Sequence, residues 1–419
     1  MDIAENTSRI DKLRWLMVIA MTIVGMTSAY INAISAYIGP FAEKGWDPAI
    51  IVIAFSVMTF MSLPGSIVGG ALKARFGNKM VLKVGGLGFA LTCIATVFIT
   101  SPWAYVVLMG GIAPFFVYCV YVVQMANIGE LFPDKAGLAT GLFVAGVAIA
   151  SALVLPLTEW LTRAMDVMYG IGLSGVIYGG FTILIGSIMI DAPRGYKPQG
   201  WTPQEYEIID EEKAEISASN KDVNWAKMMI RPAFWMVYIG EVCFGVLSSG
   251  LYSNFIGMVS ELLSVSDSAA AWLYSLFTLV MGGSGILLGY ISDRLLGPTK
   301  SLSFCCLLTA ITIGIFLITG GNSYPLFIVF IVIAGMALGA MQALTPNIMM
   351  QAWGNKYFGI NYGIMLTTLT VGSFIGPQLA VRVSMLQFLG ISGIVMAAAA
   401  VLIFGSTMFL NKDLGKKVF

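Results

Sequence analysis

Long apolar stretches separated by short polar turns run along almost the whole chain of 419 residues. Each is close to the ~20 residues that a helix needs to cross a hydrocarbon core of roughly 30 Å. The stretches lie near 14–38, 48–72, 80–100, 104–128, 136–160, 167–190, 233–257, 267–291, 300–320, 325–350, 359–381 and 386–410. This pattern predicts an all-α membrane protein with twelve transmembrane helices.

One long polar segment, 191–232, interrupts the pattern after the sixth predicted helix. It contains the acidic run Ile209-Asp-Glu-Glu-Lys213 together with several basic residues. Such a segment is typical of a solvated linker. We therefore expect an N-terminal six-helix half over 1–190, a linker over 191–232 and a C-terminal six-helix half over 233–419.

The composition supports a membrane protein. Hydrophobic residues make up 58% of the chain and charged residues 11%, against about 45–50% and about 25% in soluble domains. If the N-terminus is inside, all of the 23 Lys and Arg except Lys44, Arg163 and Arg382 fall on the inner side. The positive-inside rule then predicts a multi-pass protein of the cytoplasmic membrane whose termini and linker are cytoplasmic.

Several kinds of chemistry find no support in the sequence. The chain has no histidine, and its five cysteines lie in apolar segments without metal-ligand spacing. It carries no phosphate-binding loop and no nucleophile paired with a histidine base, and a net charge of +1 offers no footprint for nucleic acid. We expect no enzyme activity, cofactor, metal or nucleic-acid partner. The expected partners of this monomer are lipid and a small-molecule substrate.

The two halves contain related segments. Gly70-Ala-Leu-Lys-Ala-Arg-Phe-Gly-Asn-Lys79 follows the second predicted helix, and Gly289-Tyr-Ile-Ser-Asp-Arg-Leu-Leu-Gly-Pro-Thr-Lys300 follows the eighth, 219 positions later. Asn127-Ile128 and Asn347-Ile348 are separated by 220 positions. Two unrelated landmarks with nearly the same spacing indicate duplicated halves related by an axis along the membrane normal.

At these segments the chain resembles the major facilitator superfamily of secondary transporters, whose loop signature is Gly-x-x-x-Asp-Arg-x-Gly-Arg/Lys. The second half keeps the signature with one extra residue, whereas in the first half Ala74 replaces the aspartate. The resemblance implies two pseudo-symmetric six-helix bundles and a gate at each loop, the first with a weaker charge relay. The matching gate positions are Gly70, Arg75, Gly77, Lys79, Gly289, Asp293, Arg294 and Gly297.

Two patches resemble the oxalate/formate antiporter branch, which is related to monocarboxylate transporters: Glu130-Leu-Phe-Pro-Asp-Lys-Ala-Gly-Leu-Ala-Thr-Gly141 and Pro193-Arg-Gly-Tyr-Lys-Pro-Gln-Gly-Trp-Thr-Pro203. Members that handle small dianions are expected to hold an arginine in span eight and a lysine in span eleven. Local alignment places Gly285 and Leu369 at these positions. Without fixed cations, two desolvated carboxylates would be costly to bind, which disfavours a dicarboxylate.

Glu241 is the one acid that the pattern places at hydrocarbon depth. It lies roughly 12 Å along its helix at 1.5 Å per residue, where a charge costs about 2.5–3.5 kcal/mol. Helical spacing puts Tyr238, Gly245, Ser248 and Tyr252 on the same face. We expect Glu241 to carry a coupled proton or to contact substrate. The alternative is a protonated structural acid that is hydrogen-bonded across a helix pair.

Other polar side chains within the predicted spans are candidate substrate contacts. They are Ser28, Asn32 and Ser35 in the first span, Tyr118, Tyr121 and Gln124 in the fourth, Tyr238, Ser248 and Tyr252 beside Glu241, and Gln342 in the tenth. Small polar residues also pack membrane helices together, so packing alone is the competing explanation for each of them.

These features predict a secondary active transporter that works by alternating access. The substrate implied by the resemblance is a monocarboxylate or amphipathic organic acid, with Glu241 carrying a proton in symport. An alternative is a transporter or exporter of an organic cation or neutral amphipathic compound, since an acid without basic partners can host a cation. A non-transporting membrane sensor is a remote alternative.

Overall fold

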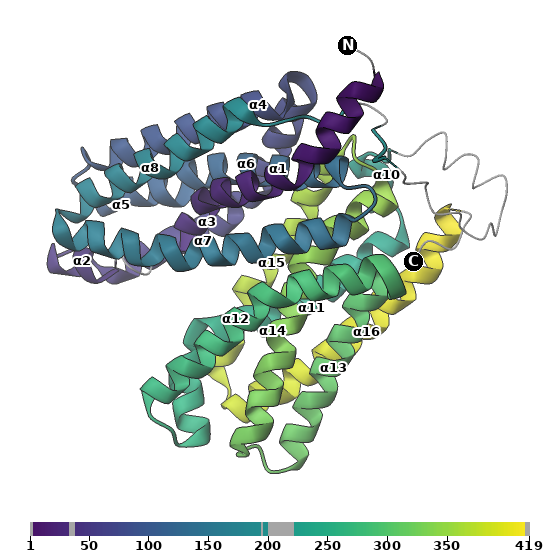
Figure 1. Cartoon of the computed structure of the whole chain (residues 1–419). Helices are drawn as coiled ribbons and strands as arrows, with labels where there is room; N and C mark the ends of the chain where they lie inside the picture. The colour runs from purple at the N-terminus through teal and green to yellow at the C-terminus, as the bar shows by residue number, and fades with distance from the viewer. Residues whose placement is uncertain (1–2, 33–37, 194–195, 200–221, 415–419) are drawn as a thin grey trace. The chain divides into compact units, whose positions relative to one another are not determined.

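The computed structural model describes residues 3–32, 38–193, 196–199 and 222–414, and within these ranges the regular structure is helical. The first part of the chain contains α1 (Ile3–Asn32), α2 (Ile38–Glu43), α3 (Pro48–Phe60), α4 (Ser62–Thr96), α5 (Pro102–Tyr105), the π-helical segment η2 (Val106–Ile112), α6 (Ala113–Leu131), α7 (Ala136–Ala164) and α8 (Val167–Ile188). Figure 1 shows their course.

The second part begins with a short helix, α10 (Trp225–Met229). It continues with α11 (Pro232–Leu263), α12 (Asp267–Ile291), the π-helical segment η3 (Ser292–Leu296), α13 (Pro298–Ile318), α14 (Tyr324–Trp353), α15 (Phe358–Arg382) and α16 (Met385–Leu414). Proline stands at the start of α11, α13 and α14, where its missing N–H removes no helical hydrogen bond.

The helices coincide with the apolar pattern. Each predicted range falls on one to three helical elements, and nine segments of the described residues are long and apolar enough to cross a membrane. The predicted second helix, 48–72, is divided between α3 and α4. α4 then continues into the predicted third helix through Gly77, where the backbone leaves helical geometry. The predicted linker, 191–232, lies largely outside the described residues.

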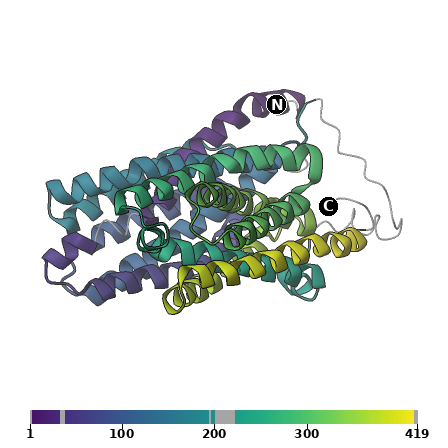
Figure 2. The same cartoon turned by 90° about the horizontal axis from the view of Figure 1, so that it is seen from below.

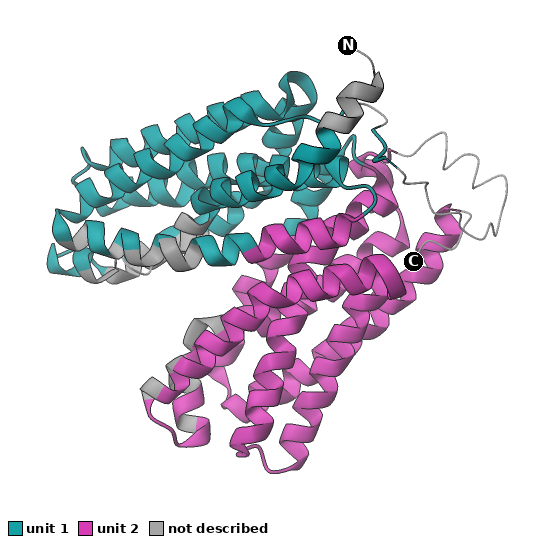
Figure 3. Ribbon diagram, viewed as in Figure 1, with its two compact units in different colours: residues 1–134, 146–202, 355–366 teal, residues 135–145, 203–354, 367–419 magenta. Residues whose placement is uncertain are grey.

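The chain divides into two compact units, which Figure 3 colours separately. Unit 1 contains Met1–Asp134, Gly146–Thr202 and Asn355–Leu366, and unit 2 contains Lys135–Ala145, Pro203–Gly354 and Thr367–Phe419. Two helices therefore contribute to both units. α7 gives its first residues to unit 2 and the rest to unit 1, and α15 gives its first residues to unit 1 and the rest to unit 2.

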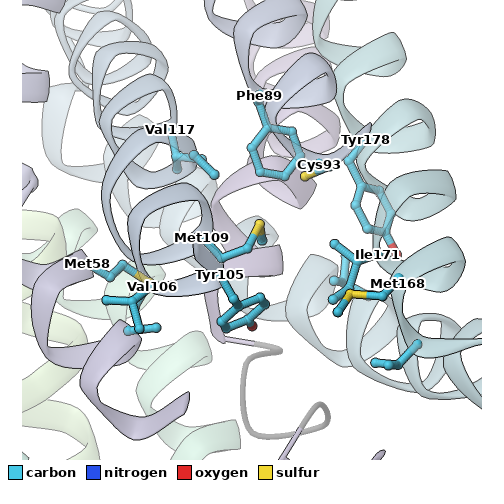
Figure 4. Packing of buried hydrophobic residues seen from close by; sticks show 14 of the residues in the cluster. Met58, Phe89, Cys93, Tyr105, Val106, Met109, Val117, Met168, Ile171 and Tyr178 are labelled. Atoms are coloured by element: carbon cyan, nitrogen blue, oxygen red, sulfur yellow. The ribbon is translucent and has the colours of Figure 1, made fainter. Parts of the chain in front are cut away.

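In unit 1, α4 packs along α6 and α8, and α1 packs against α6 and α8. A cluster of buried side chains lies between the helices, including Phe89, Cys93, Tyr105, Met109 and Tyr178 (Figure 4). Lipid tails are as apolar as these side chains, so close van der Waals packing is what holds such a cluster together. Cys93 is fully buried among aromatic rings and methionines, as expected of a small core residue.

In unit 2, α14 packs against α12 and α13, and α16 packs along α11 and α13. α16 is the yellow helix of Figure 2. Its buried face consists of small and apolar side chains, including Ser392, Met396, Ala399 and Ile403. Small residues allow the helix axes to approach closely. This scaffold positions the middle of α11, where the candidate acid lies.

The repeat predicted from the sequence is visible in the backbone of the two signature loops. Gly77 has φ 77° and ψ 172°, and Gly297, 220 positions later, has φ 76° and ψ 163°. This region favours glycine because a Cβ would be strained there. The two glycines therefore share one backbone conformation at corresponding positions of the repeat.

Candidate functional site

Glu241 lies near the middle of the apolar segment Pro232–Leu251 of α11, and only 2% of its surface is exposed. The hydroxyl of Thr345 on α14 donates a short hydrogen bond to its Oε1. The hydroxyl of Thr368 on α15 donates to Oε2 at 3.5 Å. Three helices of unit 2 thus meet at a single carboxyl group, and each of its oxygens has a donor.

No Lys or Arg forms an ion pair with Glu241 within the described residues. A buried carboxylate without a counter-charge is costly, and two neutral hydroxyls offset only part of that cost. A bound proton or another cation would neutralise the group.

The face of α11 that carries Glu241 packs on α15. One turn before Glu241, the Tyr238 hydroxyl lies 2.8 Å from the Thr367 Oγ1. One turn after it, Gly245 lies against Gly372, where a Cβ on Gly245 would stand 3.3 Å from the Gly372 Cα. The predicted stripe of α11 is thus a contact surface between two helices.

Two further predicted residues of unit 2 have weaker partners. Ser248 is buried and donates to the Gly245 carbonyl of its own helix at 3.1 Å. Gln342 is half-buried, and its Nε2 lies 3.9 Å from the Met281 Sδ, which is a weak acceptor. The side chain of Tyr252 lies outside the described residues.

In unit 1, Gln124 of α6 is 1% exposed, and its Nε2 donates to the main-chain carbonyl of Met21 on α1 at 2.8 Å. Its Oε1 is buried and has no hydrogen-bond partner among the residues that the structure describes. The amide therefore connects α1 and α6.

Of the remaining candidates in unit 1, some pack against a neighbouring helix and others make polar contacts. The Ser28 hydroxyl is buried and has no partner within the described part of the chain. Tyr121 shares a hydrogen bond with Tyr362, and Tyr118 packs on Gly65 of α4. The side chain of Asn32 and the whole of Ser35 lie outside the described residues.

The second-half signature loop ends against the start of α7. Asp293, in the π-helical segment η3, accepts hydrogen bonds from the backbone N–H groups of Gly137 and Leu138, both at 2.9 Å. These N–H groups have no partner within the helix, and a carboxylate at a helix N-terminus also interacts favourably with the helix dipole. Gly289 packs directly on the Gly137 backbone. The guanidinium of Arg294 lies 5.5 Å from the centre of the Tyr290 ring.

The first-half loop meets the start of α15 in the same way but without a carboxylate. Gly70 packs on Gly359, and a Cβ on Gly70 would stand 2.6 Å from the Gly359 Cα. The residue in the aspartate position is Ala74. The basic residues here point elsewhere: Lys73 pairs with Glu130 at 2.7 Å, Arg75 lies over Phe76, and Lys79 is exposed.

Thr345 and Thr368 were not predicted from the sequence. Thr345 stands directly before Pro346 in α14, and Thr368 belongs to the pair Thr367-Thr368 in α15. A threonine in a membrane helix usually bonds a carbonyl of its own helix, so composition alone gives no signal. That these two threonines bond Glu241 instead can be recognised only from the helices that lie against it.

A family model described as the Major Facilitator Superfamily matches residues 16–377 and, in a second match, 242–415. The chain belongs to the Major Facilitator Superfamily. It is thus a multi-pass membrane transporter and not an enzyme, as predicted.

The chain is 23% identical over 422 residues to the "Oxalate:formate antiporter" of Oxalobacter formigenes, covering 97% of this chain and 93% of that protein. It is 20% identical over 356 residues to "Monocarboxylate transporter 13" of Bos taurus, covering 84% and 76%. The predicted resemblance to this branch is confirmed.

Among solved structures, the chain is similar to the Escherichia coli fucose:proton symporter FucP, with a TM-score of 0.69, 11% identity and coverage of 96% and 98%. It is also similar to the proton:xylose symporter XylE, with a TM-score of 0.64, 13% identity and coverage of 96% and 97%. At such low identity the likeness shows the fold, and the predicted all-α membrane fold class is confirmed.

Proposed function

We propose that this transporter moves a monocarboxylate or amphipathic organic acid by alternating access, together with a proton taken up by Glu241. The observation that carries the proposal is the buried Glu241, which receives hydroxyl donors from Thr345 and Thr368 and forms no ion pair within the described residues. Similarity to proteins named oxalate:formate antiporter and monocarboxylate transporter supports an organic-acid substrate.

The positions aligned with the cations of dianion transporters favour a singly charged substrate. Gly285 offers no side chain and faces the backbone of Gly141 and Gly339, while Leu369 is apolar. A monocarboxylate that travels with one proton brings no net charge to a cavity without fixed cations. We propose Ser28, Asn32, Ser35, Tyr118, Tyr121, Gln124, Tyr238, Ser248, Tyr252 and Gln342 as the polar positions that contribute substrate contacts.

The helix α15 provides a physical route from the bound cation to the conformational change. Thr368 contacts Glu241 in the part of α15 that belongs to unit 2, and the first residues of the same helix belong to unit 1. A change of charge at Glu241 alters the free energy of a helix that both units share. Such a differential interaction is required for any ligand to shift a conformational equilibrium.

We further propose that the protein is a monomer of the cytoplasmic membrane, with its termini inside. The distribution of Lys and Arg supports this orientation. In unit 1, Lys44 forms an ion pair with Asp166 at 2.5 Å. The pair joins two loops that the orientation assigns to the outer side, so the contact agrees with it.

An organic cation is the second candidate substrate. The same Glu241, buried without a basic partner, can neutralise a positively charged amphipathic compound. In that case the substrate would take the place of the proton.

Transport assays with the purified protein in proteoliposomes distinguish an organic acid from an organic cation as the substrate. We expect uptake of radiolabelled monocarboxylates to rise with an inward proton gradient and to show counterflow. Saturable uptake of an organic cation such as tetraphenylphosphonium, with no uptake of any acid in the panel, would replace the first proposal with the second. If neither class shows counterflow, both proposals are wrong.

A further inference from the structure

The oxygen atoms around Glu241 form a compact donor set contributed by three helices of unit 2. They are the two carboxylate oxygens, the Thr345 hydroxyl of α14 and the Thr368 hydroxyl of α15. We infer that Glu241, Thr345 and Thr368 form a binding site for Na⁺ that competes with the proton. This inference rests on the proposed function, because it assigns a second coupling ion to the same residue.

The chemistry of the set selects the kind of cation. Carboxylate and hydroxyl oxygens are hard ligands that suit hard cations. One carboxylate supplies one negative charge, which neutralises a monovalent ion and leaves a divalent ion with an uncompensated charge in a dry site. No cluster of three or more His, Cys, Asp or Glu occurs in the part of the chain that the structure describes, so a transition-metal site has no comparable support.

A further oxygen is available beside Thr345. Pro346 lies inside α14 and has no N–H to donate to the carbonyl of Gln342, which is one turn earlier. A proline within a membrane helix leaves such a carbonyl to other partners, and discontinuous transporter helices use freed carbonyls for Na⁺. Loss of this donor makes the Gln342 carbonyl a candidate ligand in addition to the carboxylate and the two hydroxyls.

Among the residues that the structure describes, no fixed positive charge forms an ion pair with Glu241. The neighbouring helices α12, α13, α14, α15 and α16 carry charged residues only in their first or last turns, and α14 carries none. The titratable groups nearby are the thiols of Cys243 and Cys306 and the Tyr238 hydroxyl, which supply no positive charge. Neutralisation therefore depends on a mobile cation, and both H⁺ and Na⁺ meet that need.

The test measures the thermal unfolding of the purified full-length protein in NaCl against choline chloride at equal ionic strength and pH 8. We expect the Tm to rise with Na⁺ in a saturable way and Glu241→Gln to abolish the rise. Thr345→Val and Thr368→Val are each expected to raise the half-saturating Na⁺ concentration by about tenfold, the equivalent of ~1.4 kcal/mol. Lowering the pH by one unit is expected to raise the half-saturating Na⁺ concentration by up to about tenfold, because the proton competes with Na⁺ for Glu241.

Thr309→Val is the matched control. Thr309 is a buried threonine of α13 whose hydroxyl donates to the Cys305 carbonyl of its own helix at 2.9 Å. Its variant is expected to keep the wild-type Na⁺ response. Should Glu241→Gln fail to fold, binding of ²²Na⁺ to the wild type and to Thr345→Val decides the question.

Equal Tm values in NaCl and choline chloride at every pH, or a Na⁺ response that survives in Glu241→Gln, would overturn the inference. If Na⁺ has no effect while acid uptake still follows the proton gradient, the Na⁺ site is wrong and the proposed function stands. If Na⁺ binds at Glu241 while no acid shows counterflow, the site stands and the acid substrate is wrong.

Discussion

The same helix pair in the two units is joined by different chemistry. In unit 1, the Gln124 amide of α6 donates to the Met21 carbonyl of α1. In unit 2, the Thr345 hydroxyl of α14 donates to the Glu241 carboxylate of α11. Met21 and Glu241 are 220 positions apart, and Gln124 and Thr345 are 221 apart, in agreement with the spacing of the sequence repeat.

Of these two helix contacts, the one in unit 2 contains the ionisable group. An amide that bonds a main-chain carbonyl is a neutral pair, which stabilises the helix contact by ~0.5–1.5 kcal/mol. A buried carboxylate that receives only hydroxyls still requires a positive charge. The two equivalent positions therefore carry a neutral pair in unit 1 and an ionisable group in unit 2.

A second contrast concerns the loops. Asp293 accepts hydrogen bonds from two N–H groups at the start of α7, whereas Ala74 offers no carboxylate to the start of α15, where Gly70 packs on Gly359. Here too the charged member of the pair lies in unit 2. Five substitutions test how far this asymmetry extends, from the largest expected effect to the smallest.

Replacing Glu241 by Gln removes the ionisable group and keeps the size of the side chain. We expect concentrative uptake to fall by about 5- to 150-fold, the range of a coupling free energy of ~1–3 kcal/mol. Exchange of substrate at equal concentrations should persist, since it needs no net ion movement. Uptake in proteoliposomes, with and without a proton gradient, provides the measurement. Unchanged accumulation would assign Glu241 to packing, like its unit 1 counterpart.

Asp293→Asn tests the contrast between the loops. The variant loses the charge that lies on the α7 N-terminus, and we expect the free energy of unfolding to fall by up to ~2 kcal/mol. Ala74→Asp is its partner: it supplies a carboxylate to the start of α15 and should raise the Tm. Differential scanning fluorimetry measures both. If Ala74→Asp lowered the Tm as much as Asp293→Asn, the two loops would not be equivalent.

Gln124→Leu separates packing from coupling. Loss of the bond to Met21 should lower the free energy of unfolding by ~0.5–1.5 kcal/mol and leave the dependence of uptake on the proton gradient unchanged. Thermal unfolding and pH-dependent uptake of the same preparation provide the two readouts. A changed pH dependence would mean that unit 1 also takes part in coupling.

Asp166→Asn gives the smallest effect. Its hydrogen bond to Lys44 lowers the pKa of the Asp166 carboxyl, and Asp166 also caps α8 through the Met168 N–H. Because the pKa of Asp166 is lower in the folded state, the stabilisation that its carboxylate provides is present above the unfolded-state pKa of ~3.9. This stabilisation is lost as the pH falls through the folded-state pKa. Asparagine keeps the cap, so the variant should lose ~0.2–1 kcal/mol, less at high salt.

Thermal unfolding of wild type and Asp166→Asn between pH 3 and 7 measures this difference. The two curves should begin to converge as the pH falls below ~3.9 and should meet only below the lowered pKa of the folded wild-type carboxyl. A difference that grew as the pH fell would contradict the assignment of the lowered pKa to the Lys44 pair.

Much of the fold followed from the sequence because membrane helices leave a strong signal. Each span requires an apolar stretch of a set length, and the glycine loops at Gly77 and Gly297 carry a backbone geometry that few other residues accept. The depth of Glu241 could be predicted for the same reason. Predicting this depth required only the position of Glu241 within one apolar stretch.

The partners of Glu241 could not be predicted in this way. Thr345 and Thr368 are distant in sequence and reach the acid only through the packing of α14 and α15 on α11. The role of Gln124 likewise depends on which carbonyl of α1 lies opposite it. Hydropathy determines that a residue is within the membrane, whereas the neighbouring helices determine its contacts.

The most direct test of coupling at Glu241 records proton movement during transport. Proteoliposomes loaded with a pH-sensitive dye in Na⁺-free buffer receive a monocarboxylate that the wild type transports. Inward flux of substrate should acidify the lumen with wild-type protein, and Glu241→Gln should exchange labelled substrate without acidification. Acidification of equal size in Glu241→Gln would contradict the account, because the proton would then travel through another group.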